Sequence, residues 1–159
     1  MKLVNTLGLE PSAKAWGFES LTGQLINHLM KTKKPRHFEI YIPIYHLTIY
    51  VRLGGTTQQA YNYASKKLDY SPPLQDDGSD ASGKFLAVPG KNDLCLWFKE
   101  LKPSISCVVH EIFHAVCYIY QVRGIWPLTE SNEEAFAYLL GDITRKFLLK
   151  VKSLPEIQL

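Results

Sequence analysis

The sequence predicts a single α+β domain in which a small, mainly antiparallel sheet packs on helices. Its length of 159 residues is typical of one domain and is enough to bury a sizeable core. Apolar residues make up 46% and charged residues 21% of the chain, a composition that argues against a disordered protein. The apolar spacing changes along the chain between helical and extended periods, without the regular strand–helix alternation of a parallel sheet.

The N-terminal part predicts a helix, an extended segment and a second helix. Residues 11–30 carry apolar side chains at roughly helical spacing. Residues 38–53 are rich in β-branched and aromatic side chains, and Pro43 is expected to break or bulge this run or to place it at a sheet edge. A threonine of the pair 56–57 is a suitable N-cap for a helix that ends near residue 69.

The middle of the chain predicts a loop followed by a hairpin. Residues 70–83 contain paired prolines and an acidic, glycine-containing stretch that is typical of a surface loop. Two short apolar runs, 85–88 and 94–98, are separated by Pro89-Gly90-Lys91-Asn92, which is good turn chemistry.

The C-terminal third predicts two helices. Residues 106–122 are apolar on nearly all sides, so we expect a buried central helix that stops at Arg123-Gly124. A second helix is expected over 131–151, and residues 152–159 are expected to form a loose tail.

Charge and cysteine content narrow the function classes. Eighteen basic and 15 acidic residues give a net charge of +3, which is too balanced to indicate nucleic-acid binding. We find no run of 18 apolar residues and no secretory signal pattern at the start, so neither a membrane span nor secretion is expected. Three cysteines without a CxxC pair fit a reducing compartment, and we expect a cytoplasmic protein.

The strongest chemical signal is an HExxH sequence, His110-Glu111-Ile112-Phe113-His114. On a helix, residues four apart share a face, so the two imidazoles can ligate one Zn²⁺. The intervening carboxylate can then act as general base on a metal-bound water and later protonate the leaving amine. The alternative is a pair of hydrogen-bonded histidines with Glu111 paired to a lysine. That alternative is costly in so apolar a helix.

A resemblance extends the motif. Twenty positions after His114 stands Glu134, at the start of Glu134-Ala135-Phe136-Ala137-Tyr138-Leu139-Leu140-Gly141. This segment looks like that of the gluzincin metallopeptidases, the thermolysin-like clan, over residues 106–142. The small size is similar to that of single-domain members, including phage- and prophage-encoded ones, and so extends the expected location to a host cytoplasm. The resemblance implies that Glu134 is the third zinc ligand.

Rival ligands remain open. Ser131-Asn132-Glu133-Glu134 also fits a capping box, in which Ser131 is the N-cap and Glu134 reaches back to its amide. Glu130 and Glu133 are alternatives to Glu134, and a cysteine from the HExxH helix would make a more structural site. These cysteines, Cys107 and Cys117, are spaced to face the metal but are more commonly buried small apolar residues.

Three further positions follow from the resemblance or the spacing. The family often has an aspartate where this chain has Tyr138. Either Tyr138, a backbone carbonyl or Asp142 then orients the first histidine, or zinc binding is weaker. The strand over 94–98 is expected either to bind peptide substrate along its edge, as in gluzincins, or to be a core strand. Tyr118 lies one turn beyond His114 and is a candidate to polarise a carbonyl, or is a partly buried aromatic.

The sequence therefore predicts a minimal, single-domain zinc metallopeptidase over 1–159 that hydrolyses a peptide or protein substrate. Its catalytic residues are Glu111 and Tyr118, and its Zn²⁺ ligands are His110, His114 and Glu134. A catalytically inactive, zinc-stabilised protein-binding module is the main alternative, and a metal-free domain with a chance motif is a third. The sequence leaves the substrate and the oligomeric state open.

Overall fold

The computed structural model describes residues 34–71, 74 and 80–154, which belong to one compact unit within Thr32–Leu159. The helix predicted over 11–30 and the end of the predicted tail lie outside the described residues. The prediction of a single domain over the whole chain therefore stays a prediction.

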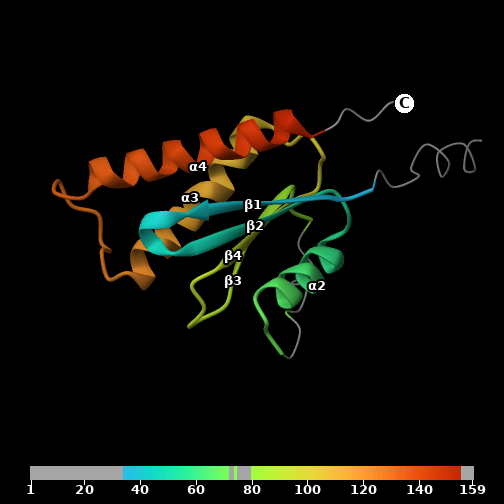
Figure 1. Cartoon of the computed structure of the whole chain (residues 1–159), viewed down its shortest axis with the longest axis horizontal. Helices are drawn as coiled ribbons and strands as arrows, with labels where there is room; N and C mark the ends of the chain where they lie inside the picture. The colour runs from blue at the N-terminus through green and yellow to red at the C-terminus, as the bar shows by residue number, and fades with distance from the viewer. Residues whose placement is uncertain (1–33, 72–73, 75–79, 155–159) are drawn as a thin grey trace, which may run out of the picture. The chain divides into compact units, whose positions relative to one another are not determined.

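A four-stranded sheet of order β1-β2-β4-β3 forms the centre of this unit (Figure 1). The outer pairs, β1 with β2 and β3 with β4, are antiparallel, whereas the central pair of β2 and β4 is parallel. Two of the three pairings are antiparallel, and the α+β class is confirmed. The strands are β1 (Arg36–Ile42), β2 (Leu47–Leu53), β3 (Gly83–Ala87) and β4 (Leu94–Phe98).

The extended run predicted over 38–53 folds back on itself at the proline. Pro43 ends β1 and begins a short 3₁₀ turn, Pro43–Tyr45 (η1), after which His46 adopts a left-handed conformation with φ of 48°. A proline cannot donate to the strand ladder and is well placed at the start of a 3₁₀ turn. The predicted break is confirmed, and its consequence is a hairpin.

Strand β4 is buried on both faces because helices cover both sides of the sheet. Leu94, Leu96 and Phe98 pack into the core on one side. Cys95 and Trp97 pack on the other, since successive side chains of a strand alternate.

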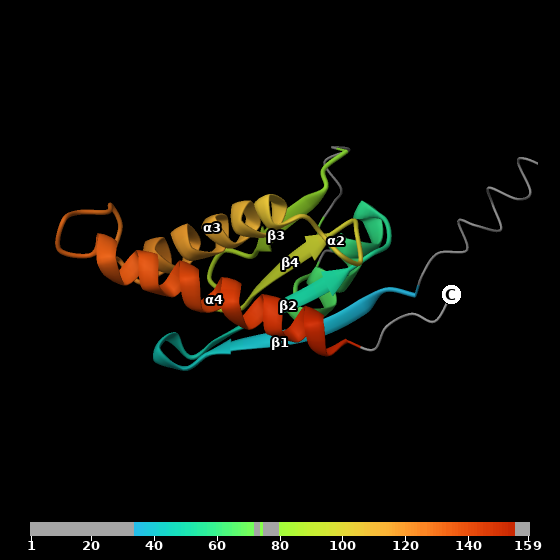
Figure 2. The same ribbon diagram turned by 90° about the horizontal axis from the view of Figure 1, so that it is seen from above.

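Three helices enclose the sheet, with α3 and α4 on one face and α2 on the other (Figures 1 and 2). Thr56 caps α2 and forms a capping box with Gln59, so the predicted threonine cap is confirmed. Ser104 caps α3, and Gly124 follows its end with a φ of 68°. The helices are α2 (Thr57–Lys67), α3 (Ile105–Val122) and α4 (Glu133–Ser153).

Helix α3 is buried along one face only, which corrects the expectation of burial on nearly all sides. Its inward side, including Val108, Ile112 and Ile119, is in the core, while Val109 and Phe113 remain exposed. By length and composition alone α3 could cross a membrane, a criterion that the core helix of a globular domain also meets. The buried face packs against the sheet and α4.

Candidate active site

The two histidines of the HExxH sequence lie side by side on α3. The Nε2 atoms of His110 and His114 are 3.1 Å apart, and both side chains are exposed. The ring planes are steeply inclined to one another, at 82°. This distance is that of a hydrogen bond between the two rings, which is the histidine–histidine contact that the sequence left open as an alternative to metal binding. The helical turn between the two residues places both rings on the same face of α3.

This spacing fits two ligands of one tetrahedral zinc ion. With Zn–N distances of about 2.0–2.1 Å, two ligating nitrogens of a tetrahedral site lie about 3.3–3.4 Å apart. The 3.1 Å separation of the two Nε2 atoms differs from this by a few tenths of an ångström. A metal ion held by both nitrogens would replace the hydrogen bond between them, with a small change in their separation and a reorientation of the rings.

Glu111 lies between α3 and the edge strand β3. Its side chain is buried, at 7% exposure, and its carboxylate accepts a hydrogen bond from the backbone N–H of Phe85. Burial raises the pKa of the Glu111 carboxyl above its ordinary value, and the neighbouring histidine side chains, the Phe85 N–H and Lys84 partly oppose that rise. The motif thus places a poorly solvated carboxyl group beside the histidine pair.

A glycine allows the helix to approach β3 this closely. A Cβ atom added at Gly83 would lie 2.9 Å from Cγ of Glu111 and 3.0 Å from Sγ of Cys107. Real Cβ atoms essentially never approach another atom as closely as the 2.9 Å to Cγ of Glu111. A larger residue at position 83 would therefore push α3 away from the strand.

These groups line one open pocket of about 310 Å³ along the free edge of β3, the edge that pairs with no other strand among the described residues. Its lining residues are Tyr61, Gly83, Lys84, Phe85, Leu86, His110, Glu111 and His114. Five of these eight were not among the predicted site residues, and two of the five, Tyr61 and Lys84, bring polar groups to the pocket. Lys84 is 8% exposed, and its ammonium group lies 5.5 Å from the centre of the Tyr61 ring. Lys84 directly precedes the apolar run predicted over 85–88, and this adjacency is the only signal that the sequence offered for it.

Glu134, the ligand implied by the family resemblance, is not gathered with the histidines. It is exposed and makes no hydrogen bond or ion pair with any other described residue. Across residues 34–71, 74 and 80–154, no three His, Cys, Asp or Glu side chains are grouped to hold a metal ion. The rival ligands Glu130 and Glu133 are likewise not grouped with the two histidines. The identity of the third ligand therefore stays a prediction.

The capping-box alternative for Glu134 is wrong. Helix α4 begins at Glu133 with Asn132 as N-cap, and the Ser131 hydroxyl is hydrogen-bonded to that of Thr129. The Asn132 side chain accepts from the Thr129 N–H and donates to the carbonyl of Ile125. Because these contacts organise the turn before α4, the helix begins two residues after Ser131.

Tyr138 and Asp142, the two side chains predicted to orient the first histidine, do not line the histidine pocket. Tyr138 is 72% exposed. The carboxylate oxygens of Asp142 lie 2.8 Å from a guanidinium nitrogen of Arg145 and 2.7 Å from Nζ of Lys146. The hydrogen bond from Lys146, with that from Arg145, lowers the pKa of the Asp142 carboxyl. The structure thus gives Asp142 a local role on α4.

The Tyr118 hydroxyl fastens the β3–β4 hairpin to α3. It donates toward the carbonyls of Val88 and Lys91, at 3.0 and 3.1 Å, and its ring lies 5.5 Å from that of Phe85. The residue does not line the pocket of the histidines. Its predicted action on a substrate carbonyl stays a prediction, while its structural role is evident.

Both cysteines of α3 are partly buried. Burial raises the pKa of the Cys107 thiol, and the charge of Glu111 adds to that effect. Burial also raises the pKa of the Cys117 thiol. A bound metal ion would itself lower the pKa of a coordinating thiol, so the cysteine alternative stays a prediction.

The strand over 94–98 is a core strand, and the prediction that it forms a substrate-binding edge is wrong. It is β4, which lies between β2 and β3 because its second edge pairs in parallel with β2. The edge beside the histidines belongs to β3. The N–H of Phe85 points away from β4 toward Glu111, and backbone groups alternate along a strand, so those of Gly83 and Ala87 also point outward.

Comparison with known proteins gives no further guide, since no family model, curated protein or solved structure matches the chain significantly. The functional argument therefore depends on the residues of the pocket themselves.

Proposed function

We propose that this protein is a zinc-dependent peptidase whose site is the pocket between α3 and β3. The observation that carries the proposal is the 3.1 Å approach of two histidine Nε2 atoms beside a buried glutamate, all within one pocket. A histidine pair with this separation suits zinc, and a poorly solvated carboxyl suits proton transfer.

Each residue of the motif has a distinct role in this proposal. His110 and His114 would hold the metal, and a zinc ion bound there would supply Lewis-acid chemistry. Glu111 would act as the general base that accepts a proton from the attacking water and as the acid that returns it to the leaving amine. The partial burial of Glu111 makes its carboxylate a better base than a fully hydrated one.

The free edge of β3 supports a peptide substrate. An extended peptide can add to a sheet edge through main-chain hydrogen bonds, and Gly83, Phe85 and Ala87 direct their backbone groups outward beside the histidines. The Phe85 N–H now donates to Glu111. A peptide carbonyl that took this donor would release the Glu111 carboxylate toward the histidine pair, so that substrate binding would free the base.

Glu134 is our proposed third ligand. Its carboxylate has no described partner to lose, and it lies in the first turn of α4, where a change of backbone conformation is least costly. Metal content at limiting zinc should fall on Glu134→Ala and stay unchanged on Glu133→Ala, its matched neighbour. The opposite order of the two variants would assign the ligand to Glu133.

The decisive experiment measures zinc and hydrolysis in the same preparations. Purified protein should contain about one zinc per chain, and His110→Ala with His114→Ala should abolish it. Glu111→Gln should keep the zinc but lose hydrolysis of a peptide-library substrate, whereas Glu100→Gln, an exposed control, should leave both unchanged. Hydrolysis retained by Glu111→Gln would refute the role of this residue, and absence of zinc would refute the proposal.

A zinc-stabilised, non-catalytic binding module is the second candidate function. It is favoured by the exposed positions of Glu134 and Tyr138, outside the histidine pocket. A structural zinc dominates stability, whereas a catalytic zinc leaves a folded protein after its removal. Thermal unfolding with and without chelator separates the two: a large loss of stability without peptidase activity would select the binding module.

A further inference from the structure

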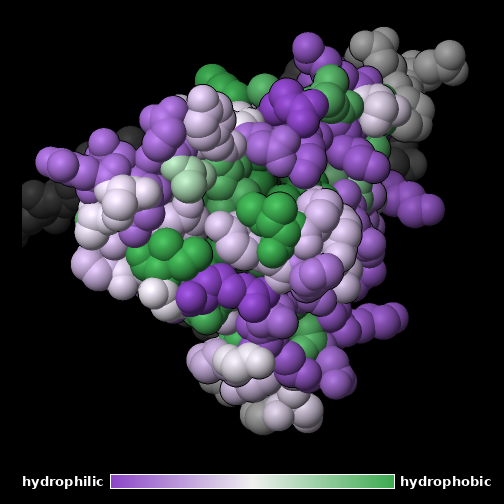
Figure 3. All heavy atoms as spheres, turned by 60° about the vertical axis from the view of Figure 1, so that its left-hand side comes forward, coloured by the Kyte–Doolittle hydropathy of each residue, from purple (hydrophilic) through white to green (hydrophobic). Residues whose placement is uncertain are grey.

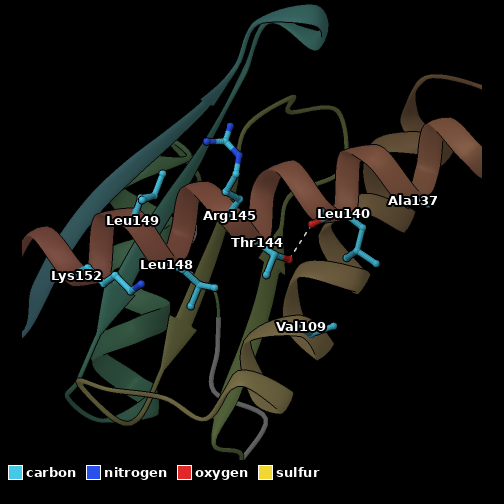
Figure 4. Close-up of a pocket in the computed structure, with 9 residues that line it drawn as sticks. Val109, Ala137, Leu140, Thr144, Arg145, Leu148, Leu149 and Lys152 are labelled. Atoms are coloured by element: carbon cyan, nitrogen blue, oxygen red, sulfur yellow. Dashed lines mark hydrogen bonds between the residues drawn. The ribbon is translucent and has the colours of Figure 1, made fainter.

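Helices α3 and α4 share a second, apolar groove on their outer surface, away from the histidine pocket. Its volume is about 560 Å³, and Val109 of α3 forms its far wall. Leu140, Thr144 and Leu148 lie on the side of α4 toward α3, and Arg145 lies on the opposite side (Figure 4). The groove is thus a long, shallow trough along the exposed face of α4.

This trough belongs to a second apolar face of α4. The inward face is the core stripe of Phe136, Leu139, Ile143 and Phe147. At 3.6 residues per turn, the trough residues fall on the other side of the helix, where Leu148 and Leu149 are 37% and 54% exposed. Apolar patches also reach the surface on the side turned forward in Figure 3. An unused apolar face on a surface helix indicates a partner.

The charges of α4 indicate which partner. Its first turn carries Glu133, and its last turn carries Lys152, which lines the trough. Lys150 lines a different pocket, and Glu134 is left to the proposed zinc site. An antiparallel copy of the same helix would bring each acidic end close to a basic end, and the two helix dipoles would oppose one another favourably. An unrelated acidic helix would match the basic end alone. The charge pattern therefore favours a second copy of this chain.

The shape of the trough agrees with antiparallel self-pairing. A Cβ atom added at Gly141 would meet nothing within 4 Å, so this position is a hole in the helix surface. If the two-fold axis passes between Thr144 and Arg145, position 141 of one copy faces position 148 of the other. Leu148 of each copy then enters the hole at Gly141 of its partner, as a knob packs between helical ridges.

We propose that the chain forms a homodimer by antiparallel packing of α4 on α4 of a second copy. The contact uses the outer faces of α3 and α4, whereas the histidine pocket opens at β3. The dimer therefore leaves the candidate active site accessible, and the inference does not depend on the proposed peptidase function.

Sedimentation equilibrium of the full chain over a wide concentration range tests the proposal. We expect a monomer–dimer equilibrium, and Leu148→Glu should raise the dimer dissociation constant at least about tenfold because it places a charge in the apolar contact. Ile44→Glu is the matched control, since Ile44 is 73% exposed on the β1–β2 turn. Its dissociation constant should equal that of the unmodified chain. A monomer at every concentration, or a dimer unaffected by Leu148→Glu, would overturn the proposal.

A second variant guards against a folding defect in the first. Gly141→Arg fills open space and should preserve the circular-dichroism spectrum while weakening the dimer to a similar extent. The register is tested by mixing chains that carry Gly141→Cys with chains that carry Leu148→Cys. A disulfide should form in the mixture, above the background of the unmodified chain, and not within either variant alone. Cross-linking of Gly141→Cys with itself would indicate parallel pairing or an antiparallel pair centred on residue 141, and either result would overturn the proposed register.

Discussion

Replacing Gly83 by alanine tests the close approach of α3 to β3 on which the candidate site depends. The new Cβ would lie 2.9 Å from Cγ of Glu111, 3.0 Å from Sγ of Cys107 and 3.2 Å from Cδ1 of Phe98. Alanine has less conformational entropy than glycine in the unfolded chain, and this difference raises the unfolding free energy by about 0.5–1 kcal/mol. Overpacking of a buried position costs about 1–3 kcal/mol. The variant should therefore lose about 1–2 kcal/mol of unfolding free energy.

Gly141→Ala is the matched control for this substitution. Because nothing lies within 4 Å of its added Cβ, only the helical preference of alanine acts, and it should gain about 0.8–1 kcal/mol. Urea unfolding at low protein concentration should give opposite signs for the two variants. Adding Cys107→Ala to Gly83→Ala should recover part of the loss. If Gly83→Ala stabilises the protein as Gly141→Ala does, α3 does not press on β3 and the reasoning about Glu111 fails.

Two further predictions concern groups outside the metal ligands. Tyr118→Phe should cost about 1–2 kcal/mol in urea unfolding, because the hydroxyl that ties Val88 and Lys91 to α3 is lost; an unchanged midpoint would contradict this role. In the folded protein, burial and the charge of Arg52 lower the pKa of His37. In the unfolded chain a histidine has its ordinary pKa of about 6.5. Stability present above pH 6.5 should therefore decrease as the pH falls below it, since the unfolded state then binds the proton more readily. His37→Gln should flatten this dependence, and an equal slope in both proteins would contradict the assignment.

Local chemistry in the sequence was enough to predict most of the elements. A threonine cap, a proline break and the turn at residues 89–92 act through neighbouring residues, and the structure confirms all three. The position of β4 could not be predicted in the same way. Its apolar run fits either an edge or a central strand, and the choice was made by a parallel pairing with β2, distant in the sequence.

The candidate site was predictable only where it is contained in one motif. The spacing of His110, Glu111 and His114 determines their shared position on a helix, and the structure places them in one pocket. Tyr61 and Lys84 reach that pocket from α2 and β3, so no local pattern connects them with the motif. Glu134 follows from a resemblance alone, and side-chain direction at a helix end depends on the preceding turn, which Asn132 organises.

The parallel pairing at the centre of the sheet has a consequence for how the protein reaches its folded state. The partners Ile49 and Leu94 are 45 residues apart (94 − 49), whereas each hairpin joins partners separated by only 5 or 7 residues. Closing the longer loop costs about 2 kcal/mol more in chain entropy, so we expect the two hairpins to form first and the β2–β4 contact to form late. Refolding kinetics of a Val51→Ala variant would reveal this order. Because every residue that lines the histidine pocket follows β2 in the sequence, we expect the pocket to assemble before the β1–β2 hairpin docks.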